Sequence, residues 1–240
     1  MVANVCYELE LNGETRVLEA LAESRPSCIF DVGANVGDWS LLAAGLFPSA
    51  QIHAFEIVPD TAQLMQERLT QSRVSSVTVN AVGLSGQPGM VSVAYLPEFS
   101  AGSSAAVVQP AGGVQWRECP VQTGDEYCRE RSIDHIDFLK IDVEGLEGKV
   151  LKGFEGMLAG ARVDVVQFEY GHLNASVRFL LGDFYDLSEG HGYVVGKVYP
   201  DQVDFRAYDA WRDENFRGPN YLAVHRDHAD LIRRLAAAKT

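Results

Sequence analysis

The apolar positions of the chain form short continuous runs that alternate with segments of helical periodicity. The strand-like runs are 28–32, 51–56, 77–82, 136–143 and 163–170. Between them, apolar residues recur three or four positions apart in 15–24, 38–46, 60–69 and 147–159. Strands that alternate with helices require crossover connections, so the pattern predicts a mostly parallel sheet with helices on both faces.

The later part of the chain has a different pattern. Two further strand-like runs, 193–198 and 221–225, lack a strong helix between them and suit an antiparallel hairpin at one edge of the sheet. Residues 89–96 alternate weakly and indicate an extra strand, and 97–113 is the longest predicted loop. The predicted fold is therefore α/β: Rossmann-like and doubly wound, with a mostly parallel sheet and an antiparallel edge hairpin.

A length of 240 residues fits one α/β domain. We expect a single domain over 1–240, with an N-terminal helical or strand extension at 1–27, a core at 28–226 and a C-terminal helix at 227–240. No apolar run reaches the roughly 20 residues that span a bilayer. The first residues have neither a basic start nor a long apolar stretch, so we do not expect a secretory signal. We expect a cytoplasmic location.

Charge and cysteine content narrow the possible partners. The chain has 20 basic and 33 acidic residues, a formal net charge of −13. Such a surface repels phosphate backbones, so neither nucleic acid nor an anionic membrane is an expected partner. The four cysteines show no CxxC and no zinc spacing, which is typical of reduced, buried thiols. Nothing in the sequence indicates an oligomeric state.

A glycine-rich turn follows the first predicted strand, in the sequence FDVGANVGD at 30–38. It is not the dinucleotide fingerprint GxGxxG, because Asn35 and Asp38 stand where the second and third glycines belong. It is not a phosphate-binding P-loop either, since no Gly-Lys-Ser/Thr follows. Asp31 at the strand end disfavours a pyrophosphate and suits a cationic ligand. A tight turn of any α/β protein is the plainer alternative.

A second acidic strand end narrows the range of ligands that we expect. Glu56 follows the second strand, 25 residues after Asp31, where a carboxylate can accept hydrogen bonds from both hydroxyls of a ribose. Together, the two positions predict a ligand with a ribose and a positive charge but no phosphates. S-adenosylmethionine has these properties.

Four segments together resemble the FkbM family of S-adenosylmethionine-dependent methyltransferases, many of which methylate hydroxyls on natural products or sugars. They are 30–40, Phe55-Glu56, the KIDVEG segment at 140–145, and 220–222. The resemblance runs from about Cys28 to about Arg226. One departure is Glu56-Ile57, where the family often has Glu-Pro.

The resemblance implies a cofactor site. It puts the methionine end of the cofactor over the first turn, the ribose on Glu56 and the adenine against Ile57. It puts the adenine edge at the end of the third strand. The implied contacts in the first turn and at that strand end are Asp31, Gly33, Ala34, Asn35 and Gly37, and Asn80, Ala81 and Val82.

Methyl transfer to an alcohol needs help in removing the hydroxyl proton. Asp142 ends the fourth strand, and Glu169 and His172 follow the fifth, so all three are expected at the same sheet edge. We predict that they surround the acceptor hydroxyl, with Asp142 also able to contact the cofactor. The alternatives are that Asp142 and Glu169 are helix caps and that His172 is an ordinary loop residue. The three could hold a divalent metal, but no short spacing fixes such a site and none is predicted.

The leading hypothesis is an O-methyltransferase acting on a hydroxyl of a small molecule. A second hypothesis is an N-methyltransferase acting on an amine. Two others belong to different classes: a nicotinamide-dependent oxidoreductase, which the missing GxGxxG disfavours, and a non-catalytic domain that keeps the cofactor fold.

Overall fold

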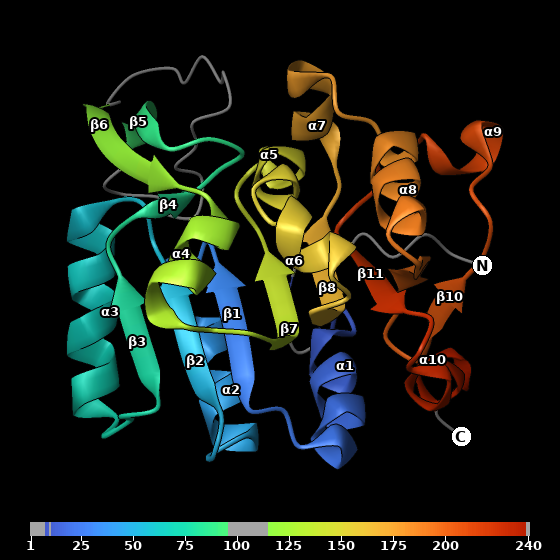
Figure 1. The fold of residues 1–240 in the computed structure, drawn as a ribbon, viewed down its shortest axis with the longest axis horizontal. Coiled ribbons are helices and arrows are strands. Elements are labelled where there is room, and N and C mark those ends of the chain that lie inside the picture. The colour runs from blue at the N-terminus through green and yellow to red at the C-terminus, as the bar shows by residue number, and fades with distance from the viewer. Residues whose placement is uncertain (1–7, 10, 96–114, 239–240) are drawn as a thin grey trace.

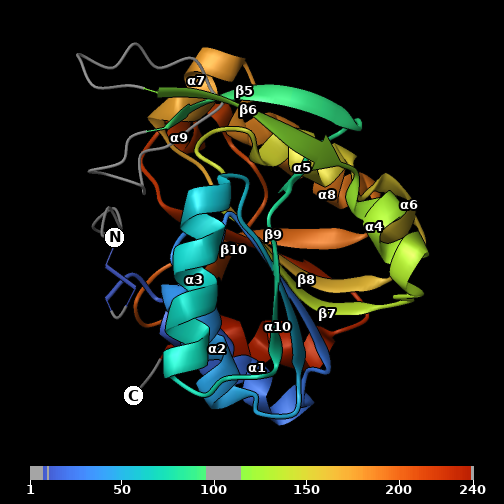
Figure 2. The same cartoon turned by 90° about the vertical axis from the view of Figure 1, so that its left-hand side faces the viewer.

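The fold is a central eight-stranded sheet covered by helices on both faces (Figures 1 and 2), seen in a computed structural model that describes residues 8–9, 11–95 and 115–238. The predicted loop 97–113 lies outside these residues. Across the sheet the strands are β10 (Val203–Phe205), β9 (Tyr193–Val198), β11 (Asn220–His225), β8 (Val163–Glu169), β7 (Ile136–Ile141), β1 (Cys28–Val32), β2 (Gln51–Phe55) and β3 (Val77–Asn80).

Each face of the sheet carries its own hydrophobic core and its own helices. One face is covered by α1 (Glu14–Leu21), α2 (Asp38–Leu46), α3 (Pro59–Gln71) and α10 (Ala229–Ala236). The other is covered by α4 (Gly124–Arg131), α5 (Glu147–Lys152), α6 (Glu155–Ala159) and α8 (Leu181–Gly190). Three short helices complete the described elements: η1 (Ala22–Ser24), α7 (His172–Val177) and α9 (Ala210–Asp213). None of the helices in these ranges is long and apolar enough to cross a membrane.

The pairing confirms the predicted fold class. Strands β3, β2, β1, β7 and β8 are parallel neighbours, so their carboxyl ends meet at one edge. The last two predicted strands, β9 and β11, do pair antiparallel. However, β11 is inserted between β8 and β9, and the hairpin at the sheet edge is formed by β9 and β10.

A smaller three-stranded sheet lies above the carboxyl ends of β2 and β3 (Figure 1). Its strands are β4 (Gly83–Leu84), β6 (Gln115–Gln122) and β5 (Gly89–Tyr95), in that order. The sequence indicated β5 but not β6. Since five of the eight β6 residues are exposed, including Arg117 and Glu118, this strand has little hydrophobic signature.

The predicted helix at 147–159 is two helices, α5 and α6, with a break at Gly153. A Cβ on Gly153 would lie 2.2 Å from the carbonyl oxygen of Ser85, so the chain turns at this glycine to pass the second sheet. At the chain ends, α1 and α10 pack on the same face of the sheet as α2. A single domain over 1–240 stays a prediction, and the packing of both end helices on one core supports it.

Candidate functional site

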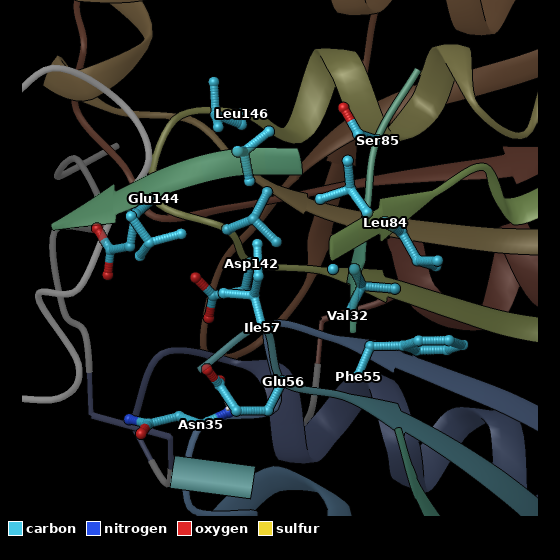
Figure 3. A pocket seen from close by; sticks show the side chains of 16 residues that line it. Val32, Asn35, Phe55, Glu56, Ile57, Leu84, Ser85, Asp142, Glu144 and Leu146 are labelled. Carbon is cyan, nitrogen blue, oxygen red and sulfur yellow. Dashed lines mark hydrogen bonds between the residues drawn. The ribbon is translucent and has the colours of Figure 1, made fainter. Parts of the chain in front are cut away.

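A cavity of about 170 Å³ opens where the carboxyl ends of β1, β2 and β7 meet the smaller sheet (Figure 3). Figure 3 shows Asn35 and the carboxylates of Glu56, Asp142 and Glu144 on one side, with Phe55 and Leu84 on the other. Val91, Val93 and Val121 of the smaller sheet also line it. The cavity is therefore acidic along one wall and apolar along the rest.

The first glycine of the turn brings two strands together. Gly33 has a φ of 86°, and a Cβ there would lie 1.8 Å from the carbonyl oxygen of Asp142. The Asp142 amide in turn donates to the Val32 carbonyl at 2.9 Å. Only glycine meets both demands, so Gly33 allows the ends of β1 and β7 to lie in contact at the cavity wall. Gly37, with a φ of 87°, allows the same close approach to Met65 of α3.

Glu56 is held rigidly at the cavity. Its Oε2 accepts from the Asn35 amide at 3.0 Å and its Oε1 from the Val58 amide at 2.8 Å. Only 8% of the residue is exposed, and this burial raises the pKa of its carboxyl. Each carboxylate oxygen keeps a further acceptor site, so the group can bind two neighbouring hydroxyls. Ile57 lines the cavity beside it, as predicted for a residue against adenine.

Asp31 lies behind the cavity wall. Its side chain is fully buried and lines neither the cavity just described nor a neighbouring one. Its Oδ2 accepts from the Ser40 hydroxyl at 2.7 Å, and its Oδ1 lies 3.6 Å from the Lys140 ammonium. Asp31 thus forms an internal ion pair, and its contact with the cofactor stays a prediction.

Lys140 links this buried carboxylate to the site. Its Nζ donates to Asp142 Oδ2 at 3.1 Å, and the side chain is only 7% exposed. Burial alone would lower the pKa of Lys140, but the carboxylates of Asp142, Asp31 and Glu14 raise it well above its usual range. Lys140 is thus a fixed cation that orients Asp142.

A second cavity, of about 270 Å³, lies beside the first and shares Gly33, Asn35 and Asp142 with it. Its other lining residues include Glu14, Ala34, Trp39 and Lys140. Within the described part of the chain, Asn35 Oδ1 and Trp39 Nε1 are buried without a hydrogen-bond partner. Such a cavity suits a ligand that carries both a hydrogen-bond donor and a hydrogen-bond acceptor.

The sequence analysis did not find Glu14 in this group. The carboxylate of Glu14 accepts from Asn12, Gln167 and Asn220, at 2.6, 2.8 and 2.9 Å, so it is fixed beside Lys140. Glu14 lies before the predicted core in the sequence and belongs to no motif. Only its position in the first turn of α1 distinguishes it from other acidic residues.

Several carboxyl groups cluster around Asp142. Glu169 ends β8 next to Asp142, and burial together with the charges of Asp142, Glu144 and Glu147 strongly raises its pKa. Burial raises the pKa of both Glu144 and Glu147 to about 7.

The turn that carries these groups has an unusual backbone. Glu144 and Gly145 both have left-handed conformations, with φ of 56° and 96°. The buried carboxylate of Glu147 holds this turn, because its Oε1 accepts from the amides of Val143 and Gly145, each at 3.0 Å. Glu147 Oε2 accepts from Asn174, which joins the turn to the segment after β8. Left-handed non-glycine residues are concentrated at functional sites.

His172 is separate from this cluster. It is the first residue of α7, is exposed and lines neither cavity. Within the described residues it makes no hydrogen bond or ion pair with Asp142 or Glu169. The structure thus brings together two of the three predicted catalytic residues.

The predicted adenine contacts at the end of β3 need correction. The Asn80 amide nitrogen donates to the carbonyls of Ala54 and Thr78, and its oxygen accepts from the Tyr127 hydroxyl. The side chain is buried and serves the packing of β3, because its hydrogen bonds are made inside the protein. Ala81 and Val82 do not line the cavity, whereas the next residues along the chain, Gly83, Leu84 and Ser85, do.

The geometry defines a class: an α/β protein with an acidic cavity beside a glycine turn at the carboxyl edge of its sheet. Residues 31–195 match the family model of the Methyltransferase FkbM domain, which is more than half of the chain. The chain belongs to the FkbM methyltransferase family. This confirms the family resemblance stated from the sequence.

Characterised relatives are distant. The chain is 27% identical over 164 residues to the hexuronic acid methyltransferase AglP of Haloferax volcanii, covering 68% of this chain and 65% of that one. It is 28% identical over 202 residues to the 31-O-demethyl-FK506 methyltransferase FkbM of Streptomyces tacrolimicus, covering 72% and 75%. The matches thus span about two thirds to three quarters of these relatives. A Staphylococcus aureus crystal structure, provisionally described as a caffeoyl-CoA O-methyltransferase, has a similar fold at 11% identity, with a TM-score of 0.50 and coverage of 93% and 86%.

Proposed function

We propose that this protein is an S-adenosylmethionine-dependent methyltransferase that methylates a hydroxyl of a small-molecule natural product or sugar. The observation that carries the proposal is the rigid Glu56 carboxylate at an adenosine-sized recess, next to the Gly33 turn. Its oxygens would accept from the two ribose hydroxyls. Ile57, Val143 and Leu146 would contact the adenine from apolar walls.

The second cavity fits the amino-acid end of the cofactor. The carboxylates of Glu14 and Asp142 would face its ammonium, and Lys140 and the Trp39 indole would face its carboxylate. Asn35 Oδ1 and Trp39 Nε1, which have no partner among the described residues, would gain one. Gly33, Ala34 and Asn35 line this cavity; Gly37 shapes the turn that presents them.

The cofactor supplies a methyl group that is already activated by its sulfonium. An acceptor hydroxyl that receives this methyl group must lose its proton. Asp142 lies at the junction of the two cavities and would accept that proton, with Glu169 next to it and Lys140 fixing its orientation. His172 stays a proposed alternative base from the exposed side of this edge.

Two relatives' names support a hydroxyl-bearing acceptor. One describes methylation of a hexuronic acid and the other of 31-O-demethyl-FK506. A cationic amine acceptor is the second candidate, because the acidic chain, with a formal net charge of −13, would not oppose it. Family membership argues against the nicotinamide-dependent oxidoreductase. The sequence defines no set of metal ligands at Asp142, so no metal is assigned a role in the proposed reaction.

The test is transfer of a methyl group to an acceptor panel. We would incubate the protein with S-adenosylmethionine and with uronic acids, macrolide alcohols and matched amines. A gain of one CH₂ on a hydroxyl compound in mass spectra is the expected result, and gain on amines alone would replace O-methylation by N-methylation.

Asp142→Asn should lower the turnover by about 10²–10⁴-fold, the usual contribution of a general base. His172→Ala distinguishes the two candidate bases, and a wild-type rate for His172→Ala between pH 6 and 9 would remove it. A wild-type rate for Asp142→Asn would remove Asp142.

A further inference from the structure

Four metal-ligating side chains converge at the opposite edge of the sheet, where β7 and β8 begin. His135 precedes β7, Asp137 and Asp164 are the second residues of β7 and β8, and His228 directly precedes α10. The Nε2 atoms of His135 and His228 each lie 3.0 Å from the same oxygen, Asp164 Oδ1. One ligand atom each from His135, Asp137 and Asp164 lies within 4.8 Å of the others.

The two carboxylates of this group are direct neighbours. Ile136 pairs with Val163 and Phe138 with Val165 in the parallel register, so Asp137 and Asp164 lie side by side on one face. Like charges in this arrangement repel each other. Among the residues that the structure describes, no lysine or arginine forms an ion pair with either one. The cations within reach are the two imidazoles or a bound metal ion.

Other interactions fix the cluster in place. Asp137 Oδ2 accepts from the amides of Ser27 and Cys28, each at 2.8 Å, and from the Ser27 hydroxyl at 3.0 Å. The Asp164 side chain is only 19% exposed, while those of His135 and His228 are 45% and 37% exposed. The carboxylates are therefore rigid, and the imidazoles close the group from the solvent side.

We propose that His135, Asp137 and Asp164 bind one divalent transition-metal ion of the zinc type, with His228 paired to Asp164 beside them. Imidazole and carboxylate ligands suit Zn²⁺, and metal–ligand bonds of about 2.0–2.2 Å at angles between a right angle and a tetrahedral one separate ligand atoms by roughly 2.8–3.6 Å. The 3.0 Å between His135 Nε2 and Asp164 Oδ1 agrees with this.

The metal site is structural. Asp137 and the proposed base Asp142 are five residues apart along β7, a separation of about 16 Å in an extended strand. The ion would join the start of β7 to the start of β8, and His228 connects Asp164 to α10, which packs against α1 (Figure 1). The ion would fasten the two strands together and take no part in methyl transfer.

The test is calorimetric titration of the full chain with ZnCl₂ after removal of metals by a chelator. We expect one Zn²⁺ per chain with micromolar or tighter affinity. His135→Ala and Asp164→Asn should each weaken it at least tenfold. His191→Ala, which removes a histidine outside the cluster, should bind Zn²⁺ as the wild type does.

A thermal unfolding series keeps the test valid if a variant is unstable. Zn²⁺ should raise the melting temperature of the wild type and of His191→Ala, but not that of His135→Ala, and it should leave S-adenosylmethionine affinity unchanged. Wild-type binding by His135→Ala and Asp164→Asn would contradict the proposal. So would no saturable binding below millimolar Zn²⁺, which would mean that the imidazoles serve only as hydrogen-bond partners of Asp164.

Discussion

Individual residues at the carboxyl edge have distinct tasks. Glu56 presents two oriented oxygens to the cavity, and Lys140 connects the buried Asp31 to Asp142. Gly33 makes the contact between β1 and β7 possible. The three acidic strand ends look alike in the sequence but have different surroundings. Glu56 faces the first cavity, Asp31 pairs with Lys140 inside the protein, and Asp142 faces both cavities.

Gly33→Ala should strongly destabilise the fold. A left-handed conformation costs a non-glycine residue about 1–3 kcal/mol, and the added Cβ would lie 1.8 Å from the Asp142 oxygen. We expect a loss of unfolding free energy of at least that size in urea titrations. Gly45→Ala in α2 is the matched control, because no atom lies within 4 Å of its added Cβ. It should gain about 0.5–1 kcal/mol; equal losses in both variants would refute the role of Gly33.

The acidic cluster predicts a pH dependence of stability. Burial raises the pKa of Glu144 from 4.5 to about 7, so between these values the folded state binds more protons than the unfolded state. Stability supplied by that protonation is present below pH 4.5 and is lost as the pH rises through 7. In urea titrations between pH 4.5 and 7, the unfolding free energy should fall less for Glu144→Gln than for the wild type. An equal fall in the two proteins would show that Glu144 is ionised in the folded protein.

Pairs of elements meet through polar groups that no motif reveals. Asn80 of β3 joins this strand to Ala54 of β2 and, through the Tyr127 hydroxyl, to α4. The smaller sheet covers the cavity with Val91, Val93 and Val121, so β5 and β6 belong to the binding site although they lie outside the central sheet.

Asn80→Ala tests whether this residue is structural. Deleting it removes the hydrogen bonds to the Ala54 and Thr78 carbonyls and the one from the Tyr127 hydroxyl, which keeps His53 as its other partner. A hydrogen bond contributes about 0.5–1.5 kcal/mol net, so we expect a loss of about 1–3 kcal/mol in unfolding free energy and an S-adenosylmethionine affinity within about twofold of the wild type. A large loss of affinity with no loss of stability would restore the adenine contact implied by the family resemblance.

At the scale of the whole molecule, the sheet has two edges with different chemistry. The carboxyl edge holds the acidic cluster and both cavities, and the opposite edge holds the His135–Asp137–Asp164 group. Since β7 and β8 run through the sheet from one group to the other, the two sites are rigidly separated.

The hydrophobic pattern was sufficient for most of the fold. Strands such as β1, β7 and β8 are buried on both faces and therefore appear as continuous apolar runs, and their ends locate the functional edge. Strand β6 is mostly exposed, so its pattern is weak. The insertion of β11 between β8 and β9 depends on long-range pairing that local periodicity does not encode.

The candidate site was predicted where a residue's role depends on its position at a strand end, as for Glu56 and Asp142. It was not predicted where the role depends on a partner distant in sequence. Asp31 meets Lys140 and Asn80 meets Tyr127 only in the folded protein, and Glu14 reaches Gln167 and Asn220 across the chain.

The central claim is that the cavity beside Glu56 binds S-adenosylmethionine, and calorimetric titration tests it most directly. The wild type should bind S-adenosylmethionine and S-adenosylhomocysteine with micromolar affinity and show no heat with NAD. Glu56→Gln should weaken both ligands about tenfold or more, whereas the exposed Glu67→Gln on α3 should match the wild type. Binding of NAD without S-adenosylmethionine, or an unchanged affinity in Glu56→Gln, would contradict the account.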